Sequence, residues 1–244
     1  MTHLLLTGTM VALVGCASRA PGTHPHDMSA AEHEQHAAAE SGEAVAHAQQ
    51  YSSSAVATHT TCSAGEARTE IIEPCWTSRV NPTEAHLRAA EEHRRAAAQH
   101  REASQALRDA EARACAGLSE ADRDISPFEH REDVVNVAPL FETRSLGRGS
   151  AQQEVGIIVT VRAVPGLTQE WLQRLVDCHL ARAAALGHSM PEMPHCPLVP
   201  HGVDRVAVTS AGGGFEVAIH TSAQALPEVR RRAAGLVAGA SGRP

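Results

Sequence analysis

The residues best suited to chemistry begin at Cys178, in the segment CHLARAAALGHSMPEMPHCPL. In an oxidising compartment, Cys178 and the second cysteine, Cys196, predict a disulfide that ties this loop to the preceding helix, with the methionines as apolar filler. Thiolate, thioether and imidazole groups also bind copper(I). The alternative interpretation is therefore a copper or zinc site formed by Met190, Met193, His195 and Cys196.

Catalysis by this segment is not expected. Cys178 and His179 are neighbours on a predicted helix, where adjacent side chains diverge by about 100°. Without a positioned base the thiol is not activated. The sequence also contains no phosphate-binding glycine loop, Ser-His-Asp pattern or zinc-protease helix motif. We therefore expect neither an enzyme nor a resident cofactor.

Histidine is abundant, with 16 residues in 244. Four of them, close together near the amino terminus, could chelate copper or zinc loosely: His24, His26, His33 and His36. The other interpretation, which we favour, is a solvated His-rich linker. Three later histidines recur at a spacing of seven and share one helix face: His86, His93 and His100. For these three histidines we favour a row of polar side chains on a solvated helix face over a series of metal or proton sites.

The elements around the cysteine segment indicate an α+β module over residues 134–240. Strands are expected at 134–143, 154–164, 204–210 and 215–221, and helices at 169–186 and 227–237. Thr168 is the expected cap of the first helix, and Gly187 its end. The order β-β-α-β-β-α predicts a small antiparallel sheet with two helices packed on one face.

A long charged helix is predicted over residues 81–117. Asn81 and Pro82 are typical of a helix start, and no further glycine or proline occurs until Gly117. Its apolar residues are mainly alanine, which favours at most a thin coiled-coil contact. Residues 118–133 form a charged linker in which Phe128 is expected to anchor into the module.

The segment before this helix is poor in large apolar residues. Residues 16–61 are therefore predicted to be a disordered tether with at most transient helix from Ser29 to Gln49, because they cannot bury enough surface to offset their ordering entropy. In the short segment 62–80, Cys62 and Cys75 are expected to form a disulfide. Cys115 remains as a leftover thiol or as a partner for one of these two cysteines.

The amino terminus has the features of an export signal. An apolar run at residues 4–15 is too short to span a bilayer, and it ends in Leu13-Val14-Gly15-Cys16. This tetrapeptide is similar to the lipobox of bacterial lipoproteins. The resemblance implies removal of a signal peptide at 1–15 and acylation of Cys16, and the residues that follow Cys16 resemble those of lipoproteins sent to the outer membrane.

Charge limits the partners that we expect. A formal net charge of -7 argues against nucleic acid, since nucleic-acid-binding proteins usually present a basic face. We therefore expect a non-catalytic lipoprotein, anchored to the outer membrane and facing the periplasm, with a structural or interaction role towards another envelope protein. The alternative is periplasmic binding of copper or zinc through the tether histidines and the Met190–Cys196 loop.

Overall fold

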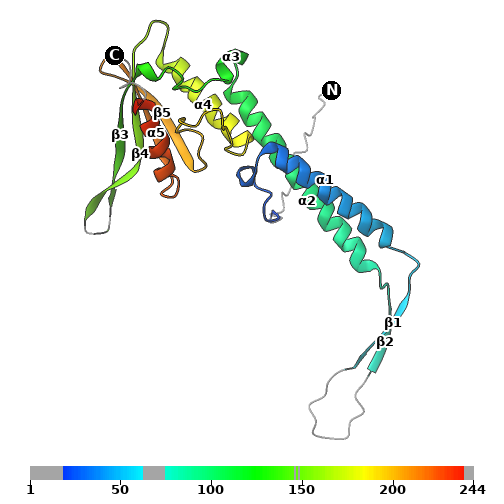
Figure 1. Cartoon of the computed structure of the whole chain (residues 1–244). Coiled ribbons are helices and arrows are strands. Elements are labelled where there is room, and N and C mark those ends of the chain that lie inside the picture. The colour runs from blue at the N-terminus through cyan, green and yellow to red at the C-terminus, as the bar shows by residue number, and fades with distance from the viewer. Residues whose placement is uncertain (1–18, 63–74, 146, 148, 239–244) are drawn as a thin grey trace, which may run out of the picture.

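The computed structural model describes residues 19–62, 75–145, 147 and 149–238. An α+β module occupies one end of an elongated molecule, and an arm of two helices leads away from it to a β-hairpin at the far end (Figure 1). The predicted signal peptide, Cys16 and the last two residues of the predicted module lie outside the described residues.

The module contains a four-stranded antiparallel sheet, as expected. Its strands β3 (Val134–Ser145), β4 (Ser150–Arg162), β5 (Val203–Ala211) and β6 (Gly214–Thr221) lie in the order β3-β4-β6-β5. Helix α4 (Gln169–Ala185) connects β4 to β5, and α5 (Leu226–Ala238) follows β6. Pro139 lies on β3, an edge strand, where its missing N–H costs no bond within the sheet.

One face of the sheet packs against both helices. Alternate residues of β4, Ile157, Val159 and Val161, are buried in the same cluster as Val176 of α4 and Val229 of α5. This period of two places every second side chain on the helix-covered face. The module core is therefore built mainly from Val, Ile and Leu of the carboxy-terminal half.

The segment between arm and module is short and partly structured. It contains α3 (Glu120–Arg123) and the 3-10 turn η2 (Arg131–Asp133). Phe128 is 2% exposed and belongs to the module core, which confirms it as an anchor.

The arm differs from the prediction. The long helix is present as α2 (Glu84–Ala114), but it is paired with a second helix, α1 (Ala30–Gln50), which is preceded by the 3-10 turn η1 (Pro25–Asp27). The prediction of a disordered tether over 16–61 is therefore wrong for residues 30–50, and also for residues 57–61, which belong to a strand. The first turn of α1 is closed by a capping box, in which Ser29 accepts from the amide of Glu32 and the Glu32 carboxylate accepts from the amide of Ser29.

Small residues explain why α1 and α2 pack. Both helices carry them every seventh residue, and all six are buried: Ala30, Ala37 and Ala44 on α1, and Ala90, Ala97 and Ser104 on α2. Small side chains let two backbones approach closely, and the Ser104 hydroxyl donates to the Ala30 carbonyl at 3.0 Å. The small residues of one helix bury little area by themselves. The sequence of α1 alone therefore does not indicate a folded helix.

The far end of the arm is the hairpin of β1 (Ala57–Cys62) and β2 (Cys75–Val80). The predicted Cys62–Cys75 disulfide is confirmed and closes the described part of this hairpin. None of the described helices combines the length and apolar character needed to cross a bilayer.

Candidate functional site

The second disulfide joins Cys115, just after α2, to Cys178 of α4. The predicted Cys178–Cys196 bridge and the interpretation of Cys115 as a leftover thiol are therefore wrong. Cys178 faces α2, where it is buried with Leu118 and Leu175. The adjacent position on α4, turned by about 100°, faces the loop instead.

His179 occupies that adjacent position and contacts the free cysteine. Its Nε2 lies 3.2 Å from the Cys196 Sγ, and the two residues are 1% and 2% exposed. No described residue gives the His179 Nδ1 a hydrogen-bond partner. A thiol and an imidazole thus meet in the core although their sequence positions are 17 apart.

Burial keeps this pair uncharged. Desolvation, and then the nearby charge of Arg182, lower the pKa of His179 to about 4. Desolvation raises the pKa of the Cys196 thiol. A reactive cysteine needs a thiolate and access to its substrate, and Cys196 has neither. The contact therefore serves packing in the module core.

The predicted metal loop is divided between two environments. Met190, Met193 and Cys196 are buried in the module core, whereas the His195 ring packs against the backbone of Gly235 in α5. The methionines thus act as apolar filler, as expected for a loop without a bound metal. No group of three His, Cys, Asp or Glu side chains within the described ranges is placed to hold a metal ion.

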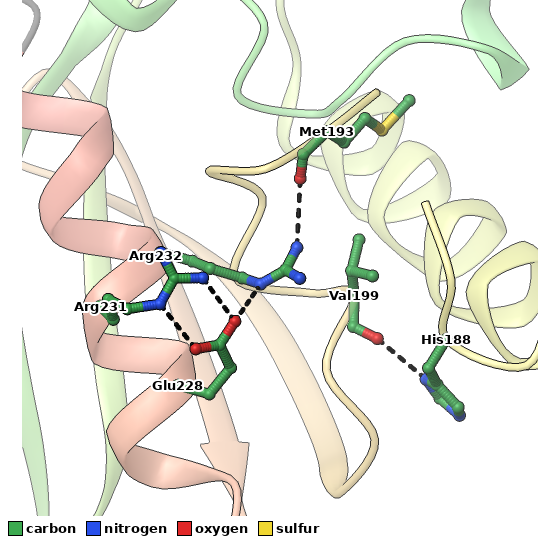
Figure 2. Close-up of polar contacts among 6 residues, drawn as sticks. All are labelled: His188, Met193, Val199, Glu228, Arg231 and Arg232. Carbon is green, nitrogen blue, oxygen red and sulfur yellow. Dashed lines mark hydrogen bonds and ion pairs between the residues drawn. The ribbon is translucent and has the colours of Figure 1, made fainter. Parts of the chain in front are cut away.

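Polar contacts fix this loop to α5. Figure 2 shows the Arg232 guanidinium between the Glu228 carboxylate, 2.7 Å away, and the Met193 carbonyl, 3.2 Å away. Hydrogen bonds from Arg231 and then Arg232 lower the pKa of Glu228 to about 2. The charged Glu228 therefore orients Arg232, which holds the loop against the helix.

The start of the loop is fixed by His188. Gly187 and His188 have φ values of 66° and 58°, so the chain leaves α4 through two left-handed residues. The His188 Nδ1–H donates to the Val199 carbonyl at 2.9 Å, a contact also drawn in Figure 2. Gly187 also lies against Ser29 at the start of α1, which places the arm directly beside the module.

The four amino-terminal histidines do not form one site. His24 and His26 are exposed near η1, His33 is buried in α1, and His36 is exposed on α1. His33 instead contacts a histidine of α2, because its Nδ1 lies 3.0 Å from the Nδ1 of His100.

This contact belongs to a series of titratable layers between α1 and α2, which we call the imidazole seam. Each layer lies seven residues further along α1 and seven residues back along α2, and the three pairs are His33 with His100, Glu40 with His93, and His47 with His86. The Glu40 carboxylate lies 2.6 Å from the His93 Nδ1, and the Nδ1 atoms of His47 and His86 lie 3.2 Å apart. The expectation that His86, His93 and His100 form a solvated face is therefore wrong.

At the inner end of the seam, the hydrogen-bond partners determine which ring nitrogens carry a proton. The His33 Nε2 lies 3.1 Å from the His24 carbonyl, which can only accept, so Nε2 carries the proton. In neutral His33 the Nδ1 is then an acceptor for the His100 Nδ1–H. Burial, and then the charges of His33 and His36, lower the pKa of His100, which favours this neutral arrangement.

A separate apolar pocket lies between residues 125–134 and the start of α4. It has a volume of about 260 Å³ and is lined largely by apolar side chains, among them Ile125, Phe128, Val164, Leu167 and Trp171. Pockets of this character commonly bind apolar ligands or partner side chains. The sequence signal for it was weak, because its walls come from three separated segments.

The imidazole seam was partly detectable in the sequence. The spacing of seven in α2 was visible, but α1 carries its matching residues as His33, Glu40 and His47, a mixed series. Comparison of the chain with models of protein families, with curated proteins and with solved structures gives no match.

Proposed function

We propose that this protein is an exported, lipid-anchored envelope protein with a non-catalytic interaction role. In this proposal Cys16 carries the acyl groups, the arm carries its hairpin away from the module, and the module binds another envelope protein. The location at the periplasmic face of the outer membrane is part of the same proposal. The support comes from the cysteine pairing, the shape of the arm and the apolar pocket.

The disulfide between Cys115 and Cys178 is the observation that carries the proposal. Disulfides persist in oxidising compartments and are rare in the cytosol. This one is buried and joins two structural units, so a reduced protein would lose the covalent link between arm and module. The Cys62–Cys75 disulfide is a second, exposed example in the same chain.

The arm is a rigid projection that extends from the module to the hairpin. At 1.5 Å per residue, the 31 residues of α2 extend roughly 45 Å, and α1 runs antiparallel beside them. The Arg182 side chain of α4 bridges Glu111 of α2 and Asp124 at 3.6 and 2.7 Å. These contacts reinforce the disulfide and hold the module at a defined angle to the arm.

The pocket beside α4 is the proposed binding surface of the module. Ile125 is 36% exposed at the pocket, which is open to apolar side chains of a partner. The pairing of buried, neutral Cys196 and His179 supplies no nucleophile, which supports a role in binding.

The anchor is tested with the full-length gene in a bacterial host. Membranes are separated from the soluble fraction, and the amino-terminal peptide is analysed by mass spectrometry. We expect an acylated Cys16 in the membrane fraction, and a Cys16→Ala variant in the soluble periplasmic fraction. An unmodified chain that keeps its first methionine and stays in the cytosol would overturn the proposal.

The binding surface is tested by cross-linking in intact membranes. An Ile125→Glu variant places a charge at the pocket and should lose the cross-linked envelope partner. Val135→Glu is the matched control, because Val135 is 63% exposed and does not line the pocket. Equal cross-linking by both variants and the parent would rule out the pocket as the binding surface.

A further inference from the structure

We propose that His47 and His86 form a binding site for a divalent transition-metal ion of the zinc, nickel or copper class. The ion would clip α1 to α2 near the outer end of the arm. This inference concerns the arm alone and does not depend on the lipid anchor or on a partner of the module.

The first argument is the regularity of the imidazole seam. Coiled coils usually place large apolar side chains at inward positions that recur every seven residues. Here small residues fill one set of inward positions, and a second recurring set holds His33, Glu40 and His47 on α1 and His86, His93 and His100 on α2. Polar groups at such positions weaken the packing of a helical hairpin, so their repeated use indicates a ligand or a charge that the hairpin accommodates.

The second argument is the separation of the two nitrogens. Zinc–imidazole bonds are about 2.0–2.1 Å long, so two nitrogens at tetrahedral positions lie roughly 3.3 Å apart. The Nδ1 atoms of His47 and His86 lie 3.2 Å apart, which matches this spacing. A hydrogen bond between two neutral rings has a similar length, and metal titration separates the two interpretations.

The third argument is the surroundings of the pair. His93 stacks on His47 with ring centroids 5.4 Å apart, and the Glu40 carboxylate accepts from the His93 Nδ1–H at 2.6 Å. Glu40 thus orients the His93 ring, which packs on the His47 ring. The carboxylate also places negative charge near the pair, which favours a cation there.

Solvent access favours the His47–His86 pair over the His33–His100 pair as the metal site. His47 and His86 are half-buried, whereas His33 and His100 are 0% and 5% exposed. No three metal-binding side chains of the described chain converge on one point, so the ion takes two protein nitrogens and completes its shell with water. Imidazole ligands favour zinc, nickel and copper(II) over magnesium and calcium, which prefer oxygen.

The experiment uses the full chain with its disulfides intact. Zinc, nickel or magnesium is titrated in by calorimetry, and copper(II) is followed by electron paramagnetic resonance, which counts bound nitrogens. We expect saturable binding of one zinc or nickel ion, no binding of magnesium, and a copper signal with two nitrogen ligands. Removing both ligands, in H47A/H86A, should weaken binding at least about tenfold.

Two variants serve as controls. His59→Ala removes an exposed histidine of β1, outside the seam, and should bind metal like the parent. H33A/H100A removes the inner layer and should keep the two-nitrogen copper signal. Circular dichroism confirms that each variant retains its helices.

Three outcomes distinguish a metal site from a hydrogen bond. A parent protein that binds none of these metals would show that the His47–His86 contact is a hydrogen bond only, and would overturn the proposal. Metal binding that H47A/H86A retains in full would place the ion elsewhere and overturn it equally. A loss confined to H47A/H86A would support it.

Discussion

The Cys115–Cys178 disulfide should contribute strongly to the stability of the junction between arm and module. The perturbation is the double variant C115A/C178A, studied under oxidising conditions. Both cysteines are 1% exposed, so alanine keeps the site apolar and introduces no polar group into it. The variant therefore tests the covalent link with little change in chemistry.

The magnitude follows from the chain that the bond closes. The two cysteines are 63 residues apart, and a crosslink over that length restricts the unfolded chain by about 4 kcal/mol. The Cys62–Cys75 bond closes only 13 residues, and the same relation gives about 3 kcal/mol. The hairpin strands that this second bond joins are largely exposed. Loss of the Cys62–Cys75 bond should therefore destabilise the hairpin and leave the junction between arm and module unchanged.

The assay is urea unfolding followed by tryptophan fluorescence. The chain has two tryptophans, Trp76 in β2 and Trp171 in α4, so a Trp76→Phe background leaves a single probe beside the junction. In that background C115A/C178A should lower the free energy of unfolding by about 4 kcal/mol and steepen its dependence on urea, because the unfolded chain expands. C62A/C75A is the matched control and should leave the Trp171 transition in place. If C115A/C178A and its parent unfold at the same urea concentration with the same slope, the reasoning is refuted.

Two further perturbations test the module core. The unfolded chain protonates His179 near pH 6.5, whereas the folded chain does so only near pH 4. The stability that neutral His179 provides is therefore present above pH 6.5 and is lost as the pH falls towards 4. Denaturation at several pH values should show the parent losing about 3 kcal/mol of stability relative to His179→Gln between these pH values. In β4, a Cβ on Gly156 would overlap the Ile219 carbonyl oxygen of β6, so Gly156→Ala should lower the melting temperature and the free energy of unfolding by about 3 kcal/mol. The control Gly42→Ala meets no atom within 4 Å in α1 and should stabilise that helix by about 0.5–1 kcal/mol; equal effects of the two glycine substitutions would contradict the packing of β4 on β6.

Much of the module was predictable because its signals are local. The apolar run Ile157-Ile158-Val159 predicts a strand, which the structure confirms, although Ile158 is only half-buried. Thr168 accepts from the amide of Trp171, as its place before α4 predicts. Cys62 and Cys75 are close enough in sequence to pair whatever the rest of the chain does. Each of these features depends on residues that are neighbours along the chain.

The cysteine pairing in the core was not predictable in the same way. The sequence spacing predicted a bond from Cys178 to Cys196, and Cys115 was expected to be a leftover thiol or a partner of Cys62 or Cys75. The choice depends on which side of α4 faces α2, and one residue along a helix turns a side chain by about 100°. The packing of α2 against α4 thus assigned Cys178 to Cys115 and His179 to Cys196.

By itself the sequence determined the order of strands and helices in the module, the length of α2 and the pairing of Cys62 with Cys75. Only the tertiary structure decided that α1 is a helix and that its histidines meet those of α2. The physical reason is that alanine and imidazole bury too little surface in one helix to indicate folding. Their stabilising contacts exist only once two helices align in one register.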